Sequence, residues 1–198
     1  KRIGLDTYKN QRRGGVGITG MTTKAEDVVE HILITTNHQT VLFFTNRGRV
    51  YPLKSYRVVE TSRTAKGVHI SNLIPMEGDE RITALIKVRD YDPTKYFFMA
   101  TKKGIVKKTQ LSEFSSMSKR GITAIKLNKD DELIGVKFTE GEQNIMLGTA
   151  QGKAIIFAEE EVRAMGRNTH GVIGIKLKKG DYVVGMDKLS KGNDVLII

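Results

Sequence analysis

The chain has 198 residues, of which 39% are hydrophobic, enough to form the core of one or two domains and too many for a disordered chain. It contains no cysteine, which excludes disulfides and thiolate metal sites, and no apolar run reaches the roughly 20 residues of a membrane-spanning helix. Its 33 Lys and Arg against 22 Asp and Glu give a formal net charge of +11. This excess is spread along the chain and favours a polyanionic partner.

The first informative segment is Gln11-Arg12-Arg13-Gly14-Gly15-Val16-Gly17. Glycine lets a backbone turn tightly and approach another surface, and the arginine guanidinium matches the geometry of phosphate. The segment therefore predicts a loop that contacts a phosphate backbone. The overlapping residues 15–20 also spell a dinucleotide-binding pattern, but that motif needs an apolar strand before it and a helix after it. Polar and basic residues precede it here, so we reject a dinucleotide site.

One glycine then recurs along the chain, at Gly17, Gly67, Gly121 and Gly171, which are 50, 54 and 50 residues apart. Polar or basic residues precede each of these glycines, and an apolar run follows each of them. About ten residues later, an acidic residue opens a second apolar run. A fixed period of this length is typical of repeat architectures such as β-propellers.

A second pattern of the form Thr-x-x-Gly separates pairs of apolar runs, at 45–48, 101–104 and 149–152. A short connection with glycine between two such runs predicts a β-hairpin. Lys1–Leu5 resembles Lys107–Leu111, which follows the second hairpin turn, and Asp194–Ile198 resembles the first strand of a hairpin. We therefore expect the chain to be part of a longer protein, beginning late in one repeat and ending early in another.

Local propensity and the repeat disagree at one place. Residues 23–33 favour a helix, with a capping box at Thr23 and Glu26, whereas the equivalent segments of later repeats favour strands. The repeat is the stronger argument, so we predict a strand at Val28–Thr35. A short helix is predicted at Glu159–Ala164, because three glutamates occupy its first turn.

Residues for catalysis are not evident. The four histidines lack metal-ligand spacing, there is no phosphate-binding GxxxxGK[ST] motif, and acidic residues such as Asp130 and Asp131 recur at turns, where Asp is common for backbone reasons. The strand aromatics are expected in the core, namely Phe43, Phe44, Tyr96, Phe97 and Phe98. The sequence predicts no catalytic residue and no metal site.

Basic residues instead recur in each repeat, at turns and strand ends. A solvated charged surface is the alternative explanation for any one of them. Stacked repeats would set them side by side, as needed to follow a phosphate backbone with little base readout and to bend it. The candidate DNA-binding residues are Arg12, Arg13, Arg47, Arg49, Lys54, Arg63, Lys66, Lys102, Lys103, Lys107, Lys108, Lys119, Arg120, Lys153, Arg163 and Arg167.

These residues also resemble a known family, the C-terminal domains of DNA gyrase A subunits. Residues 11–17 are similar to the signature box of that family. Further similarity lies in segments that cover essentially the whole chain, including residues 44–51, 78–84, 131–136 and 162–169.

The resemblance implies an all-β fold, a β-pinwheel of four-stranded blades of about 50 residues, in which neighbouring blades exchange strands. The family has about six blades, so residues 1–198 would form one partial domain. The expected divisions are the end of a first blade at 1–30, successive blades at 31–92, 93–141 and 142–190, and the start of another blade at 191–198.

The implied function is sequence-nonspecific DNA binding and chiral wrapping within bacterial gyrase, an ATP-dependent type II topoisomerase that introduces negative supercoils. The family needs the box for supercoiling, and Val16 stands where many members have a basic residue. Implied partners are double-stranded DNA and two further gyrase polypeptides, the GyrB-type ATPase and another copy of the A-type chain. No cofactor is expected in this domain, since ATP and Mg act elsewhere in the holoenzyme. The resemblance also implies a cytoplasmic protein with no membrane association, and an isolated fragment that is a monomer.

Two alternatives stay open. The equivalent domain of topoisomerase IV resembles these repeats but lacks an intact glycine-rich box. The second alternative is a propeller-like protein-interaction scaffold. It would explain the repeats, and the basic charge would then have no role in binding.

Overall fold

The computed structural model describes residues 1–8, 10–22 and 28–189. Its strands are β1 (Thr40–Thr45), β2 (Arg49–Lys54), β3 (Ile82–Val88), β4 (Tyr96–Thr101), β5 (Ile105–Gln110), β6 (Ile122–Thr123), β7 (Leu133–Thr139), β8 (Asn144–Thr149), β9 (Ala154–Ala158), β10 (Val172–Ile173) and β11 (Val183–Leu189). Helical structure in the described residues is limited to the 3-10 turns η1 (Leu5–Thr7), η2 (Ser55–Arg57), η3 (Ile70–Asn72), η4 (Leu111–Phe114) and η5 (Glu159–Glu161). The predicted all-β class is confirmed.

Each predicted Thr-x-x-Gly hairpin is present and forms the centre of a sheet. The hairpins are β1–β2, β4–β5 and β8–β9. In each turn the glycine N–H donates to the threonine carbonyl, as in the pair Gly48 and Thr45 at 2.9 Å. The last strand of each repeat returns antiparallel to the first strand of the hairpin, so that β3 pairs with β1, β7 with β4 and β11 with β8.

Neighbouring sheets exchange strands. Strand β6 follows the β4–β5 hairpin in sequence but pairs with β2 of the preceding sheet, and β10 pairs with β5 in the same way. Among the described residues the sheet orders are therefore β3-β1-β2-β6, β10-β5-β4-β7 and β11-β8-β9. The crossing segment is held further by Gly48 O, which accepts from the backbone N–H groups of Ala124 and Ile125. This exchange confirms the β-pinwheel.

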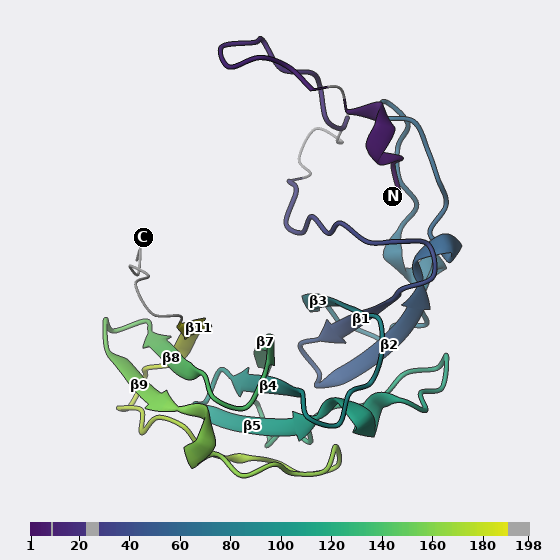
Figure 1. Cartoon of the computed structure of the whole chain (residues 1–198). Coiled ribbons are helices and arrows are strands. Elements are labelled where there is room, and N and C mark those ends of the chain that lie inside the picture. Colours follow the sequence, from purple (N-terminus) through teal and green to yellow (C-terminus); the bar gives the residue numbers. More distant parts are fainter. Residues whose placement is uncertain (9, 23–27, 190–198) are drawn as a thin grey trace.

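The sheets follow one another around an arc (Figure 1), with β3, β7 and β11 on its inner side and β2, β5 and β9 on its outer side. Apolar side chains fill the spaces between sheets. One cluster joins the first two sheets through Phe44, Phe97 and Phe114, whose rings pack edge to face at 5.0 to 6.4 Å between centroids. A second cluster joins the second and third sheets around Phe98 and Leu147. The prediction of core aromatics is confirmed for Phe43, Phe44, Phe97 and Phe98, and Tyr96 is half-buried.

The predicted strand at Val28–Thr35 is wrong. These residues form no strand, and Val28, Val29, Ile32 and Ile34 are exposed. In the later repeats the equivalent strand pairs with the first strand of the preceding hairpin, as β3 does with β1. No hairpin precedes Val28–Thr35 among the described residues, so the segment has no such edge with which to pair.

The remaining sequence predictions of local structure have mixed outcomes. The helix predicted at Glu159–Ala164 is only the 3-10 turn η5. It ends at Val162, whose backbone is extended with φ −103° and ψ 108°. The capping box at Thr23 and Glu26 and the strand at Asp194–Ile198 lie outside the described residues.

We expect Gly121→Ala to lower the free energy of unfolding by about 2–4 kcal/mol. Gly121 has a φ of +77°, and a Cβ there would lie 2.5 Å from Cε1 of the buried Tyr51. Urea denaturation measures the loss. Gly148→Ala is the matched control, because its Cβ would meet no atom within 4 Å. Equal stabilities of the two variants would contradict the close packing of the crossing segment.

Candidate nucleic-acid interface

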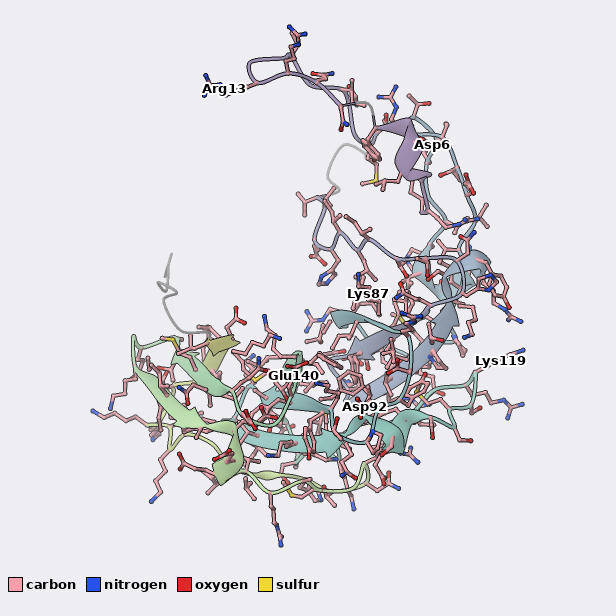
Figure 2. The ribbon with its side chains drawn as sticks, in the orientation of Figure 1. Asp6, Arg13, Lys87, Asp92, Lys119 and Glu140 are labelled. Atoms are coloured by element: carbon pink, nitrogen blue, oxygen red, sulfur yellow. The ribbon has the colours of Figure 1, made fainter. Side chains whose placement is uncertain are left out.

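Four segments of seven residues end at the recurring glycines, and we call them the rim loops: 11–17, 61–67, 115–121 and 165–171. Two of them lead directly into the crossing strands β6 and β10. The loops 61–67, 115–121 and 165–171 lie on the outer side of the arc, and the loop 11–17 projects from its N-terminal end (Figure 1). The labelled side chains Arg13 and Lys119 point away from the body of the protein (Figure 2). Strand exchange therefore places one loop of each repeat at the outer edge.

The first rim loop is the glycine-rich box. Gly15 N–H donates to Arg12 O at 3.0 Å, and Gly17 N–H donates to the Gln11 side-chain oxygen at 2.9 Å. Gly14 and Gly17 have φ values of +87° and +76°. These bonds close a tight turn that leaves both Arg12 and Arg13 exposed. Such a turn presents two guanidiniums to a ligand.

The other rim loops carry further cations. Lys66, Lys119 and Arg120 are exposed, and Arg163 is exposed just before the fourth loop. Arg63 is half-buried and donates to Thr19 O at 2.8 Å, which ties the second rim loop to the segment after the box. Seven of the sixteen predicted DNA-binding residues thus fall within the rim loops: Arg12, Arg13, Arg63, Lys66, Lys119, Arg120 and Arg167.

A second group of predicted residues lies at the hairpin turns, where they contact a carboxylate, a ring or a backbone carbonyl. Arg47 binds Asp79, with Nε to Oδ1 at 3.1 Å, and the hydrogen bond from Arg47 lowers the pKa of that carboxyl. Lys102 lies 5.2 Å from the ring centroid of Tyr182. Lys103 Nζ donates to a backbone carbonyl at 2.7 Å.

The remaining residues of the prediction differ in exposure. Arg49 is half-buried and donates to Arg120 O at 2.9 Å, so that it holds the third rim loop from β2. Lys153 is exposed at the third hairpin turn. Lys54 is exposed at the far end of β2 and donates to His38 O at 3.3 Å.

The prediction that Lys107 and Lys108 contact DNA is wrong in this structure, because both are buried. Lys107 Nζ donates to the carbonyls of Ala124, Arg167 and Thr169, and Lys108 Nζ donates to Glu159 O at 3.0 Å. Successive residues of a strand face opposite sides of a sheet. Both sides of β5 are covered here, so each lysine is buried whichever way it points.

Buried carboxylates have structural partners. Glu80 accepts from the hydroxyls of Thr45 and Tyr51, at 2.9 and 2.6 Å, and burial together with this bond raises the pKa of Tyr51 to about 12. In the part of the chain that the structure describes, no group of three or more His, Asp or Glu residues is arranged to hold a metal ion. Over the same residues, no helix is long and apolar enough to cross a membrane.

Strand-exchanging sheets in an arc, with basic loops along its outer edge, define a propeller-type domain of the β-pinwheel class. The chain belongs to the family described as the DNA gyrase C-terminal domain, beta-propeller, whose model matches residues 1–36, 39–89, 95–140 and 143–190. The DNA gyrase A protein of Staphylococcus epidermidis is 48% identical over 94% of this chain and 21% of its own length. That of Lawsonia intracellularis is 45% identical over 98% of this chain and 24% of its own length. The chain therefore spans about a fifth of the length of these relatives.

Two solved structures are similar to this chain. The C-terminal domain of DNA topoisomerase IV superposes with a TM-score of 0.80 at 31% identity, covering 87% of this chain and 54% of that one. The DNA gyrase A C-terminal domain superposes with a TM-score of 0.70 at 27% identity, covering 95% of this chain and 60% of that one. The chain thus spans little more than half of each of these solved structures.

We expect the stability of the chain to rise with pH above neutrality because of Lys107. Burial, and then the nearby Arg167 guanidinium, lowers the pKa of Lys107 to about 8, whereas a lysine in the unfolded chain titrates near 10.4. The unfolded chain thus binds more protons between these two values, and stability increases with pH across that window. Relative to Lys107→Met, the free energy of unfolding of the natural chain should gain about 2 kcal/mol between pH 7 and 10.

Urea titrations of both proteins at matched pH values measure this difference. Lys108→Met provides the control, since it also removes a buried lysine. A difference between the natural chain and Lys107→Met that does not change with pH would show that the lysine titrates normally.

Proposed function

We propose that this chain is a DNA-wrapping module of a bacterial gyrase, which binds duplex DNA without sequence preference and bends it around the outer side of the arc. The observation that carries the proposal is that exposed cations stand in three successive rim loops, where Lys66 and Arg120 occupy the same position directly before the recurring glycine. Exposed cations on successive repeats can contact a phosphate backbone over a distance greater than one blade could span.

The chemistry of the rim loops supports backbone contact over base readout. Their cations stand on turns, and no helix of the described residues is available to enter a major groove. Duplex DNA resists bending, so the energy of wrapping has to come from many phosphate contacts along the path. A net charge of +11 adds a long-range attraction that increases the rate of association.

The comparisons support placing this module in a type II topoisomerase. The curated relatives are gyrase A proteins, and the chain covers about a fifth of each. On this proposal, DNA cleavage and ATP hydrolysis with Mg belong to other parts of the enzyme, and the GyrB-type ATPase and another copy of the A-type chain join through those parts. The glycine-rich box at residues 11–17 favours gyrase over topoisomerase IV.

Binding of the chain to duplex DNA should weaken steeply with salt and depend little on sequence. Replacing Lys119 and Arg120 together by Gln should weaken binding by about tenfold and reduce the slope of log affinity against log salt by about 1–2. Fluorescence anisotropy on two duplexes of unrelated sequence measures both quantities. Lys87→Gln is the control, because Lys87 lies on the inner strand β3 (Figure 2). An equal effect of Lys87→Gln would place the DNA elsewhere.

Wrapping is tested separately from binding. Ligation of a nicked circle in the presence of the chain should shift its linking number in one direction. Arg12→Glu with Arg13→Glu should abolish most of that shift, because a box of reversed charge repels the phosphates it would guide.

A protein-interaction scaffold, the remaining alternative, predicts no shift with the natural chain and no effect of the charge reversal. The same circles, ligated with and without each protein, decide between the two functions. A shift that persists unchanged after charge reversal would remove the box from the DNA path.

A further inference from the structure

Two lysines at equivalent positions of the repeat bind the backbones of two rim loops. Lys1 Nζ donates to Arg63 O at 2.6 Å and Ala65 O at 2.8 Å. Lys107 Nζ donates to Arg167 O and to Thr169 O, the latter at 3.3 Å. In both loops the acceptor carbonyls stand four and two residues before the recurring glycine, at 67 and 171. The same group of carbonyls therefore surrounds an ammonium twice.

The backbone beside each lysine repeats as well. Arg2, which follows Lys1, forms an isolated parallel β-bridge with Glu60, and Lys108, which follows Lys107, forms one with Ala164. Each pair of cations thus runs alongside the residues that lead into a rim loop. This agreement between two repeats argues that the contacts are a built feature of the fold.

An ammonium suits this role because it offers three donors and no acceptor. When the carbonyls of a rim loop point inward to accept from the ammonium, the side chains on the opposite side of the loop point outward. Lys107 additionally binds Ala124 O at 2.8 Å, directly after β6, so a single Nζ links the segment that follows the third rim loop to the fourth rim loop. The charge-assisted bonds are stronger than ordinary backbone bonds, in loops that otherwise lack strand pairing.

The surroundings of Lys107 argue against a role in stability alone. It is fully buried, and the charged groups that act on it are Arg167, which repels it, and Glu113, which favours its charge. No carboxylate forms an ion pair with Lys107 among the described residues. A buried charge without such a partner costs stability, so its contribution lies in fixing the loop.

The third rim loop is held by an arginine and not by a lysine. The position equivalent to Lys107 in β2 is Tyr51, whose hydroxyl donates to Glu80. Arg49 donates to Arg120 O there. A single guanidinium bond to one carbonyl replaces the lysine with its several carbonyls.

We propose that Lys1 and Lys107 are positioning residues that hold the rim loops 61–67 and 165–171 in the conformation that contacts DNA phosphates. The inference rests on the proposed function, since it assigns a purpose to the fixed loops. The lysines themselves do not reach solvent-borne phosphate. They act through Arg63 and Lys66 in one loop and through Arg167 in the other.

The test compares Lys107→Met with Lys108→Met in the full chain. Both remove a buried ammonium from adjacent positions of β5, but only the Lys107 side chain binds a rim loop, because the Lys108 side chain donates to Glu159 O. In Lys107→Met, backbone amides of residues 165–171 should exchange hydrogen at least about tenfold faster. DNA affinity should fall by about three- to tenfold, and the salt slope should decrease by about 1. Lys108→Met should leave the rim-loop exchange, the affinity and the salt slope unchanged.

Lys1→Met provides a second variant with little risk to folding, because Lys1 is only half-buried. It should accelerate exchange in residues 61–67 and leave residues 165–171 unchanged, whereas Lys107→Met should do the reverse. Lys107→Arg, which keeps a cationic donor, should restore part of the slow exchange and of the salt slope.

The outcomes separate the inference from the proposed function. Unchanged exchange in the loop of each variant would overturn the inference, as would faster exchange with unchanged DNA affinity and salt slope. Failure of the natural chain to bind DNA would reject the proposed function and the phosphate-contacting purpose with it, while the exchange data would still show whether the lysines hold the loops.

Discussion

The structure depends on the close approach of each crossing segment to the outer strand of the preceding sheet. Gly121 lies against the ring of Tyr51, and a Cβ at Gly171 would come within 2.5 Å of Val106 O. These contacts permit β6 and β10 to complete sheets to which their own hairpins do not belong. Because the chain must travel outward to make this crossing, it leaves a loop at the outer edge before each one. The position of the candidate DNA surface is thus a consequence of strand exchange.

The cations of the chain fall into groups that the fold, and not their sequence spacing, determines. Most rim-loop cations are exposed, Arg47 and Lys102 at hairpin turns contact a carboxylate and a ring, and Lys107 and Lys108 are buried. On the proposed function, positive charge at the surface attracts DNA, whereas positive charge in the interior binds backbone carbonyls. One residue type therefore serves two functions in the same repeat, and burial distinguishes them.

Much of this fold could be predicted from the sequence, because glycine and the Thr-x-x-Gly turns have strong local preferences that recur at a fixed period. The hairpins and the rim loops follow from those residues directly. The pairing of β6 with β2 does not, since two residues carry no register of their own and the partner strand is distant in the sequence. The burial of Lys107 and the unpaired segment at Val28–Thr35 could not be predicted for the same reason. Each depends on which neighbouring strand covers or fails to cover the position.

The buried lysine exposes a conflict between stability and function in such a repeat. An apolar residue at position 107 would remove the cost of burying charge, yet it would leave the carbonyls of the fourth rim loop without their donor. A mobile loop binds a stiff polymer weakly. Each contact of its cations then carries the entropic cost of ordering the loop backbone that supports them. Ordering the loops within the folded protein places that entropic cost in folding, so that it no longer opposes each encounter with DNA. A lowered pKa at Lys107 is the measurable trace of this arrangement.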